Sequence, residues 1–591
     1  MKRIYLWMIM GMAMLFASCS PEKVNVSVVA TSDMENALFA YDYKYLNEGR
    51  GGGAVVASYL NELRSRLGAE NVVYVDNGDV LAGWPVNYYM KYIDKSETTI
   101  AADAMNLLGC EVYNLGEGDL SIGSATLQRH VKSMKGTAVC ANIIDAKSGK
   151  PLYKPYAIVE RNGLKIAFLG LITDAVDKYI SASTLEGMGL KIADAESAAR
   201  EWMDVIKNNE KPDVIIGLFH TGASSASKRN NSRENIGQTI VRNVAGFDAV
   251  VCGHDGLRRT RTVESIDGRK VTLASPGRRG MYAVEINITG ERAKEGLDKK
   301  SVDVDVKSMI SREKDKEYVA AIRARAIEMG KALATPFAAL KADAQAVDAL
   351  FGSSAYVDLI HKIQMKYSGA DLSIAHPYTI EMSFADGNVS LNDIRRFFPM
   401  GGKLYTVKLK GSEIREMLLY SVSNYYKNLY KKEGSILKYN REGTRLGKNT
   451  KDLESVGGLR YNVHLNKKKD EGKLQILGLA NGMPFDKEKE YTVAVPEDMV
   501  MTVNLALSLG AKVKSNEMQN RIVAISDKEI TELVLDYFKE NKVVEMKPLG
   551  NWTLQPASWM KSVKENEMNK LSSIYFPQAL IEDEMLEPTQ K

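Results

Sequence analysis

Acidic residues and histidines follow six short apolar runs in the first half of the chain. They stand at Asp33 and Glu35 after 26–30, Asp79 after 72–75, Glu117 and Asp119 after 111–115, Asp174 after 166–171, His220 after 214–219 and His254 after 249–252. Carboxylates and imidazoles are the groups with which proteins hold divalent transition metals. The pattern therefore predicts a metal site assembled from segments that lie far apart in the chain.

The six apolar runs are predicted to be the interiors of strands. Helical stretches alternate with them, such as 54–67 and 194–208, and Asp194 is a suitable N-cap for the second stretch. This alternation favours an α/β layered domain over residues 24–300. Ligands of open α/β folds gather beyond the carboxyl ends of strands, which is where the acidic residues and histidines stand.

Length and composition indicate several domains and no nucleic-acid partner. A chain of 591 residues with 45% hydrophobic and 26% charged residues is expected to form two or three ordinary globular domains. The net charge of +5 is too small to indicate nucleic-acid binding. Cys110, Cys140 and Cys252 cannot all pair and have largely apolar neighbours, so we expect buried free thiols.

The first residues have the pattern of a secretory leader. Lys2 and Arg3 precede an apolar stretch from Ile4 to Phe16 that is shorter than the ~18–20 residues of a membrane helix. The following Leu15–Cys19 resembles a bacterial lipobox, so residues 1–18 are predicted to be a signal peptide and Cys19 a lipidated N-terminus. The alternative is an ordinary signal peptide with an incidental cysteine. Either way we expect export, and the lipid predicts a periplasmic or outer-membrane lipoprotein whose membrane contact is the anchor alone.

The character of the chain changes after residue 300. Residues 301–334 are charged and Ala-rich with helical spacing, and we expect a linker helix there. Residues 335–525 mix helical and strand patterns and are predicted to form a second, α+β domain. A helix over 529–541 and an irregular tail are expected to complete the segment 526–591.

The chain resembles the two-domain 5′-nucleotidase family of secreted metallophosphoesterases, which includes UDP-sugar hydrolases. The motifs that carry the resemblance are Thr31-Ser32-Asp33, Gly51-Gly52-Gly53-Ala54, Gly78-Asp79, Ala141-Asn142-Ile143, Gly170–Asp174, His220-Thr221-Gly222, Gly253-His254, Asp393–Gly402, Leu404–Lys410 and Pro484-Phe485-Asp486. Each motif is weak alone, but their order over residues 24–525 is specific. The resemblance implies a four-layer metallophosphatase sandwich over 19–300, followed by a smaller α+β domain.

The resemblance also implies metal ligands, with departures at several working positions. The bridging Asp of the family matches Asp79, and its metal-binding histidines match His220 and His254. Glu117 stands in place of the family's Asn ligand, and Glu35 in place of the His of its Asp-x-His motif. Two side chains of the family are missing here: Gly118 replaces the catalytic His, and Gly256 replaces the last ligand.

One complete metal shell remains on this pattern, and a second one is weaker. Its members are Asp79, Glu117, His220 and His254, a donor set that suits zinc, manganese or iron. The second shell would consist of Asp33, Glu35 and Asp79, whose oxygens suit manganese, magnesium or calcium. One or two divalent ions, Zn, Mn or Mg, are therefore expected. Asp119 is the candidate proton donor in place of the missing histidine.

The substrate side of the resemblance is less complete. In the family, the second domain stacks a nucleobase between aromatic rings and holds phosphate or ribose with arginines. The matching positions here are Arg395, Arg396, Phe398 and Met400, and Pro399–Gly402 lacks the family's Phe and Asn. The alternative is a strand-end core with a solvated basic rim.

Two functions are compatible with these residues. One is an exported metal-dependent phosphoesterase of the 5′-nucleotidase type that hydrolyses phosphate esters of nucleotides or related small molecules. The other is a catalytically degenerate lipoprotein that keeps the fold and binds a ligand. The acidic replacements Glu35 and Glu117 favour the enzyme, because they still offer ligands to a cation.

Overall fold

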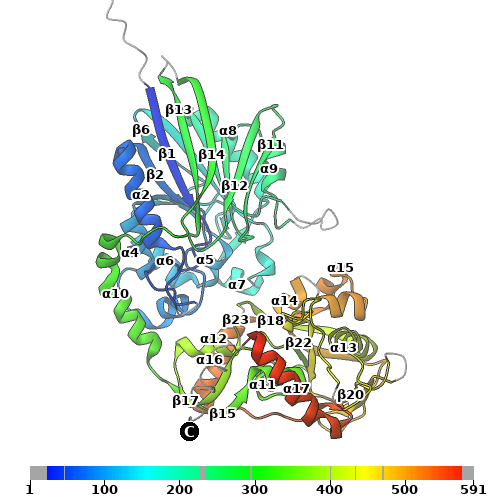
Figure 1. Cartoon of the computed structure of the whole chain (residues 1–591). Coiled ribbons are helices and arrows are strands. Elements are labelled where there is room, and N and C mark those ends of the chain that lie inside the picture. The colour runs from blue at the N-terminus through cyan, green and yellow to red at the C-terminus, as the bar shows by residue number, and fades with distance from the viewer. Residues whose placement is uncertain are drawn as a thin grey trace, which may run out of the picture. The chain divides into compact units, whose positions relative to one another are not determined.

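The structure is a computed structural model of the whole chain and describes residues 23–575 except 45–46, 181, 225–232, 293–295, 400, 433, 469–471 and 502–503. Two compact units divide between Ala332 and Leu333 (Figure 1). The predicted signal peptide, Cys19 and Met400 lie outside the described residues. Within the described ranges, no helix combines the length and the apolar character that crossing a membrane requires.

Two six-stranded sheets form the centre of the first unit. In spatial order, the first sheet contains β14 (Leu297–Ser308), β13 (Tyr282–Arg292), β1 (Lys23–Thr31), β2 (Val72–Asp76), β3 (Cys110–Asn114) and β4 (Thr137–Val139). The second contains β11 (Arg258–Glu264), β12 (Lys270–Pro276), β10 (Ala249–Cys252), β9 (Val214–His220), β7 (Leu164–Ile172) and β6 (Tyr156–Arg161). A short pair, β5 (Ile143–Asp145) and β8 (Leu190–Ile192), lies apart from both sheets.

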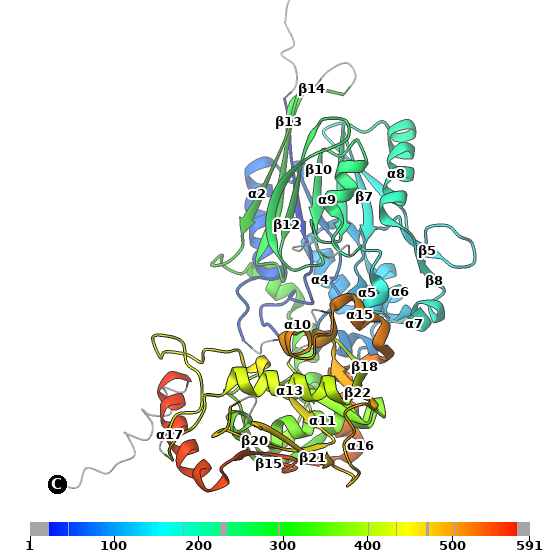
Figure 2. The ribbon, with the colours of Figure 1, turned by 90° about the vertical axis from the view of Figure 1, so that its right-hand side faces the viewer.

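The two sheets face one another across an apolar core. Valines of β1 and β2 pack there with Ile166, Phe168 and Ile216 of the second sheet. Helices cover the outer faces: α2 (Gly53–Leu67) lies on the first sheet, and α8 (Ala195–Val205) and α9 (Gly237–Asn243) lie on the second (Figures 1 and 2). This arrangement is the four-layer sandwich that we expected.

The remaining helices of the first unit connect the strands. They are α3 (Val86–Tyr88), α4 (Ile100–Leu108), α5 (Glu117–Ser121), α6 (Ser124–Ser133), α7 (Ala182–Gly187) and α10 (Lys316–Ala334). The predicted N-cap is confirmed, because the Asp194 side chain accepts a hydrogen bond of 2.8 Å from the backbone N–H of Ser197. Cys110, Cys140 and Cys252 are buried free thiols, as predicted.

The parallel strands bring the candidate residues together. β1, β2 and β3 pair in parallel in the first sheet, and β7, β9 and β10 pair in parallel in the second. All six coincide with the apolar runs seen in the sequence. Because parallel strands end at the same edge of a sheet, the loops that follow them meet there.

The expected helix over residues 301–334 is wrong in its first part. Residues up to Ser308 belong to β14, which pairs with β13 along its length, and the helix α10 begins only at Lys316. The reason is a period of two in the sequence: Val302, Val304 and Val306 pack on the core, while charged residues alternate with them.

The second unit contains three sheets. A three-stranded sheet contains β17 (Ser383–Val389), β15 (Ala338–Gln345) and β24 (Val543–Glu545). A five-stranded sheet contains β19 (Ser455–Gly457), β16 (Leu372–Ala375), β22 (Glu490–Pro496), β18 (Lys403–Lys410) and β23 (Ile522–Glu529). The third contains β21 (Leu474–Leu479), β20 (Leu459–His464) and β25 (Trp552–Gln555). The helices are α11 (Ala355–Ser368), α12 (Leu391–Phe397), α13 (Gly411–Tyr425), α14 (Glu497–Met501), α15 (Ser515–Met518), α16 (Ile530–Asn541) and α17 (Ala557–Tyr575).

The irregular tail predicted after residue 541 is also wrong. β24 pairs with β15 and β25 pairs with β20, so this segment supplies an edge strand to each of two sheets. The helix α17 is fixed by the buried carboxylate of Glu567, which accepts hydrogen bonds of 2.6 and 2.9 Å from the backbone N–H groups of Ile436 and Leu437. Strands of three and four residues are too short to show a period in the sequence.

Candidate metal centre

His220 stands at the centre of a cluster of carboxylates. It is the last residue of β9 and is fully buried. Its Nδ1 lies 2.7 Å from the carbonyl O of Asn77 and donates to it, because a carbonyl only accepts. Its Nε2 lies 3.2 Å from Oε2 of Glu117, 3.4 Å from Oδ2 of Asp79 and 4.0 Å from Oδ1 of Asp33. The free nitrogen therefore points to three acidic groups.

The spacing of these atoms suits a shared cation. Around one ion with bonds of about 2.1 Å, tetrahedral donors lie about 3.4 Å apart. The donor atoms of Glu117, His220 and His254 lie within 4.8 Å of one another, and so do those of Asp33, Asp79 and His220. His220 Nε2 and Glu117 Oε2 are buried and make no hydrogen bond with the described residues. Two buried polar atoms without hydrogen bonds, facing one point, fit a metal ion.

His254 completes the first of these groups. It follows β10, and its backbone N–H donates to both oxygens of Asp33 at 3.1 Å. Its ring Nδ1 lies 2.7 Å from Oε1 of Glu117. Burial lowers the pKa of His254, but the charge of Glu117 and the hydrogen bonds with Glu117 and Glu234 together outweigh burial and raise that pKa to about 10. Glu117 therefore lies between the two imidazoles.

Asp33 and Asp79 are held in unusual backbone conformations. Their φ angles are 52° and 60°, in the left-handed region that non-glycine residues rarely adopt. Burial raises the pKa of Asp33 to about 7, with His220 opposing the rise and Asp79 adding to it. Such strained positions cluster at functional sites, where neighbouring structure holds them in place. Here these backbone conformations bring the two carboxylates close enough to share one ion.

The hydrogen bonds that the Asp119 side chain accepts from the described residues come from backbone N–H groups. Its Oδ2 accepts from the N–H of Asp79 at 2.7 Å and of Gly116 at 3.0 Å, and its Oδ1 accepts from Leu81 at 2.8 Å. Burial raises the pKa of Asp119 to about 7. These contacts are those of a carboxylate that braces two loops, so the geometry favours a positioning role over the expected role of proton donor.

The structure does not bring Glu35 to the cluster. Its Oε2 lies 2.5 Å from Nζ of Lys44 and 3.3 Å from Nη1 of Arg279. Burial raises its pKa, but the charge and hydrogen bond of Lys44 and the charges of Arg279 and Arg278 together outweigh burial, so the pKa of Glu35 is lowered. The predicted all-oxygen shell therefore does not form, and His220 takes the place of Glu35 beside Asp33 and Asp79.

The position of the family's catalytic histidine has no room for a side chain. A Cβ on Gly118 would lie 2.6 Å from Cβ of Ala82 and 2.8 Å from Oδ1 of Asp79. The Gly118 N–H instead donates to that Asp79 oxygen at 2.7 Å. This loop therefore orients Asp79 with its backbone.

Comparison with known proteins shows which proteins the chain resembles. Residues 334–500 match the model of the 5′-nucleotidase C-terminal domain. A NAD nucleotidase of Haemophilus influenzae has 17% identity and a TM-score of 0.59, over 90% of this chain and 99% of that one. The second unit thus resembles the 5′-nucleotidase C-terminal domain, and the chain shares its fold with this two-domain nucleotidase.

Two curated proteins that are similar in sequence to this chain match it over different lengths. A 2′,3′-cyclic-nucleotide 2′-phosphodiesterase/3′-nucleotidase of Yersinia enterocolitica is 28% identical over 41% of this chain and 38% of its own length. The trifunctional nucleotide phosphoesterase protein YfkN of Bacillus subtilis is 24% identical over 92% of this chain and 39% of its own length. The chain thus spans about two fifths of the length of these two relatives.

Glu234 lies beside the cluster of candidate metal ligands, and the sequence analysis did not predict it. Glu234 Oε1 lies 3.2 Å from Nε2 of His254, and its Oε2 lies 2.9 Å from Nζ of Lys178. Tyr179 donates to the same carboxylate. The hydrogen bond with His254 is the largest cause that lowers the pKa of Glu234 to about 2. In the sequence, no apolar run stands directly before Glu234. The pattern that indicated the other residues therefore did not indicate this one.

The described residues that we expected to bind substrate contact other residues of the second unit. Phe398 is 1% exposed, and its ring meets that of Tyr378 edge to face at 4.7 Å. Arg395 donates to the carbonyl of Pro399, and Arg396 donates to the carbonyl of Ser383 at 2.8 Å. Phe398 is thus a core residue, while both arginines contact backbone oxygens.

Proposed function

We propose that the chain is an exported, metal-dependent phosphoesterase that hydrolyses phosphate esters of nucleotides or related small molecules. The observation that carries the proposal is the convergence of Asp33, Asp79, Glu117, His220 and His254 at the loops that follow parallel strands. The comparisons support it, because the relatives are named as nucleotide phosphoesterases.

Asp79, Glu117, His220 and His254 would hold the ion, and the set of two imidazoles and two carboxylates fits zinc or manganese. A divalent ion in such a site polarises a phosphoryl oxygen and lowers the pKa of bound water. The chain itself fixes the donors. The Asn77 carbonyl orients His220, the Gly118 N–H holds Asp79, and Glu234 occupies the second nitrogen of His254.

The chain also limits the rate that we expect. Gly118 leaves no side chain at the position from which the family's histidine assists catalysis. Loss of a general acid or base typically costs ~10²–10⁴ in rate. We therefore expect slow hydrolysis, fastest for substrates whose leaving group is a weak base.

The test is an assay of the purified chain with added Mn²⁺ or Zn²⁺ against AMP, 2′,3′-cyclic AMP and a nitrophenyl phosphate ester. Asp79→Asn and His220→Gln should abolish turnover and lower the metal content measured by elemental analysis. His464→Gln is the matched control, because His464 lies in the second unit and bonds Gln475 at 3.1 Å. Full metal content without turnover of any ester would leave the degenerate binding protein as the function.

Export and lipidation are part of the proposal and rest on the sequence of residues 1–19. Lys2 and Arg3, the apolar stretch and Cys19 have the order of a lipoprotein leader. Labelling with a fatty-acid analogue in a bacterial host should mark the protein, and Cys19→Ser should remove the label. A labelled Cys19→Ser variant, or an unlabelled parent, would contradict lipidation at this residue.

A further inference from the structure

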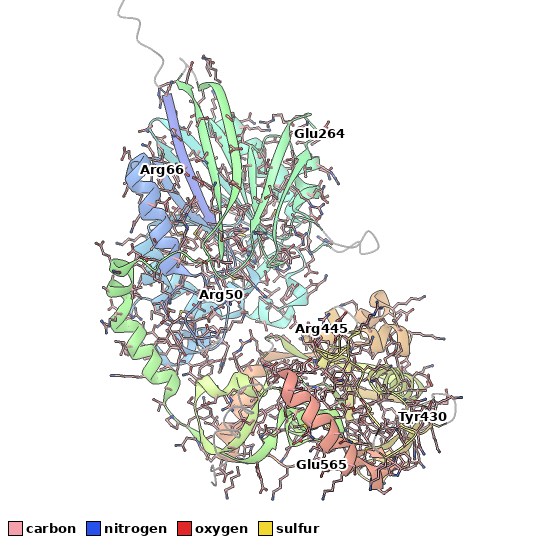
Figure 3. All side chains as sticks on the ribbon, viewed as in Figure 1. Arg50, Arg66, Glu264, Tyr430, Arg445 and Glu565 are labelled. Atoms are coloured by element: carbon pink, nitrogen blue, oxygen red, sulfur yellow. The ribbon has the colours of Figure 1, made fainter. Side chains whose placement is uncertain are left out.

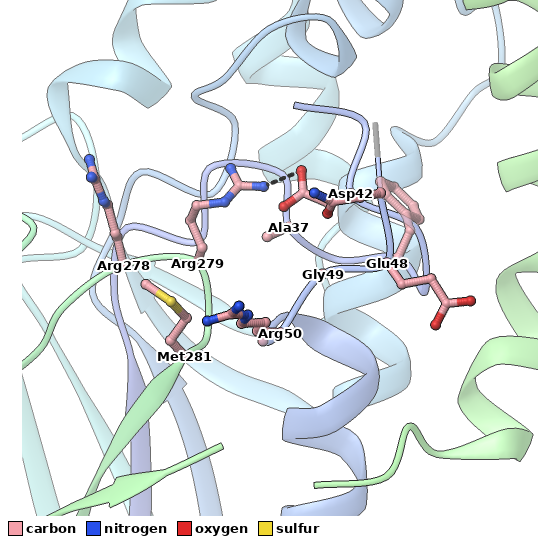
Figure 4. A pocket seen from close by; sticks show the side chains of 11 residues that line it. Ala37, Asp42, Glu48, Gly49, Arg50, Arg278, Arg279 and Met281 are labelled. Atoms are coloured by element: carbon pink, nitrogen blue, oxygen red, sulfur yellow. Dashed lines mark ion pairs between the residues drawn. The ribbon is translucent and has the colours of Figure 1, made fainter. Parts of the chain in front are cut away.

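A second hollow of the first unit lies apart from the metal cluster. It has a volume of about 400 Å³, and its lining includes Asp42, Glu48, Arg50, Arg278 and Arg279 (Figure 4). Phe39 and Met281 add an apolar wall. None of the lining residues belongs to the groups of candidate metal ligands. We call this hollow the arginine pocket.

Two arginines of the pocket form no ion pair within the described part of the chain. Arg279 is 6% exposed and pairs with Asp42 at 2.6 Å and Glu35 at 3.3 Å. The acidic Glu48 on the rim pairs outward with Lys314 at 3.2 Å. Arg50 and Arg278 are exposed and form no ion pair with any residue that the structure describes. The charge of Arg278 helps to lower the pKa of Glu35, so Arg278 lies within the field of that carboxylate. The pocket therefore keeps an excess of positive charge, which comes mainly from Arg50 and partly from Arg278.

Backbone contacts fix the two loops that carry these arginines. Gly52 has a φ of 99° and its N–H donates to the carbonyl of Gly280 at 3.3 Å. A Cβ on Gly51 would lie 2.7 Å from the carbonyl O of Arg279. The glycines of the Gly51–Gly53 cluster thus allow the loop of Arg50 to touch the loop of Arg278, so that both arginines line one cavity.

The arginine pocket shares a loop with the metal cluster. The Arg279 N–H donates to the carbonyl of Asp33 at 2.8 Å, and the Gly53 N–H donates to the carbonyl of Ala37 at 2.8 Å. Residues 33–37 therefore carry a candidate metal ligand at one end and a pocket wall at the other. The backbone of Asp33 therefore contacts the backbone of a residue that lines the pocket.

We propose that the arginine pocket binds the phosphate group of a small organic phosphate through Arg50 and Arg278. The guanidinium fork matches the geometry of phosphate oxygens and forms charge-assisted hydrogen bonds with them. The apolar wall of Phe39 and Met281 packs against the organic part of the molecule. A volume of about 400 Å³ lies within the ~300–1,000 Å³ of ordinary small-molecule sites.

The test is calorimetry on the full chain in a chelator, which excludes both metal-bound phosphate and hydrolysis. AMP should bind, adenosine should not, and Arg50→Ala with Arg278→Ala should weaken AMP at least about tenfold, because each charge-assisted hydrogen bond contributes strongly. Inorganic phosphate distinguishes the sources: binding as tight as that of AMP identifies the free ion, and weaker binding identifies an organic phosphate. Both results support a phosphate site.

Control variants separate this site from general charge effects and from misfolding. Arg445→Ala removes an exposed arginine of the second unit and should leave AMP affinity unchanged (Figure 3). Glu48→Gln removes the rim carboxylate and should strengthen binding. Arg50→Lys with Arg278→Lys should retain part of the affinity, because charge remains without the fork. Absence of AMP binding at millimolar concentration, or unaltered affinity in the double alanine variant, overturns the proposal whether or not the enzyme hydrolyses esters.

Discussion

His254 and Glu117 are 137 residues apart in the chain, yet Nδ1 of the imidazole lies 2.7 Å from Oε1 of the carboxylate. The other oxygen of Glu117 lies 3.2 Å from Nε2 of His220. One carboxylate thus bridges two imidazoles at the position where the 5′-nucleotidases carry an amide. A carboxylate adds a negative charge that an amide lacks, so we expect the centre to hold its cation more tightly and with less positive net charge.

Glu117→Gln tests this bridge with a change of charge and almost none of volume. Two buried imidazoles would lose their shared anion, and we expect metal affinity to fall by at least ~10–100-fold, the range seen when supporting groups of metal sites are removed. Competition with a chromogenic chelator measures the change. Glu201→Gln, an exposed carboxylate on α8, is the control. Equal metal affinity in both variants would contradict a ligand role for Glu117.

Glu234→Gln tests the carboxylate that faces the other nitrogen of His254. The amide keeps the size of the side chain but loses the charge that accepts from Tyr179 and pairs with Lys178. We expect a loss of metal affinity smaller than that of Glu117→Gln, because Glu234 orients a ligand and does not belong to the cluster. Titration with Zn²⁺ in the calorimeter gives both values. A loss larger than that of Glu117→Gln would make Glu234 itself a ligand.

Gly118→His should fail to restore a catalytic histidine. Because a Cβ there would lie 2.6 Å from Cβ of Ala82, the loop must shift, and Asp79 would lose its backbone donor. We expect lower ester turnover and a loss of about 1–3 kcal/mol in the free energy of unfolding, as for other overpacked sites. Urea unfolding and the phosphatase assay measure the two effects. Higher activity in this variant would show that the loop has room after all.

The buried His361 makes stability depend on pH. Burial lowers its pKa to about 3, and its two ring nitrogens bond Ser373 and Ser455 at 3.0 and 2.9 Å. The unfolded chain binds a proton on this residue below about pH 6.5 while the folded chain does not, so acid favours unfolding. Between about pH 6 and 4 this histidine should cost up to ~1.4 kcal/mol of unfolding free energy per pH unit.

His361→Gln should therefore flatten the dependence of unfolding free energy on pH in that interval, whatever its effect on stability at neutral pH. The comparison is with His464→Gln, whose side chain bonds only Gln475 near the surface. Urea unfolding at several pH values gives the slopes. An unchanged slope in His361→Gln would mean that the histidine protonates within the fold.

Glu567 tests the attachment of α17. Its carboxylate accepts four hydrogen bonds, from the Ser435 and Tyr439 hydroxyls and from two backbone N–H groups. Glu567→Ala leaves these donors unpaired, and we expect a loss of about 3 kcal/mol in unfolding free energy. Glu565→Ala, on the exposed side of the same helix, should change stability by less than about 0.5 kcal/mol (Figure 3). Similar losses in both variants would contradict an anchoring role.

The sequence predicted those parts of the site that follow apolar runs in the chain. His220 and His254 each directly follow a fully apolar run, and the parallel pairing of β9 and β10 places them side by side. Asp33, Asp79 and Glu117 follow strands of the other sheet in the same way. The period and polarity of the chain are enough to locate such residues, because strand ends are local features.

Other parts depend on partners that no local pattern reveals. Glu35 follows the same strand as Asp33, but its side chain pairs with Lys44 and Arg279 and does not join the cluster. Arg279 is 244 residues away in the chain, so no local pattern reveals this pair. Glu234 is recognisable only by its contact with His254. The predicted helix overlaps the strand β14 because charged residues hide the alternation of its valines. The short strands β24 and β25 are defined by the sheets that they join.

The strand pairing of the last segment sets an order for biosynthesis. β24 lies parallel to β15, and β25 lies parallel to β20, although about two hundred and about ninety residues separate the members of each pair. β15 lacks the second of its two neighbours until residue 545 has emerged, and β20 lacks its second neighbour until residue 555 has emerged. The second unit therefore reaches its final topology only after nearly all of it has been synthesised, while the sheets of the first unit are already complete by residue 308. Nascent chains halted between these points should carry a finished metal centre beside an unfinished, protease-sensitive partner.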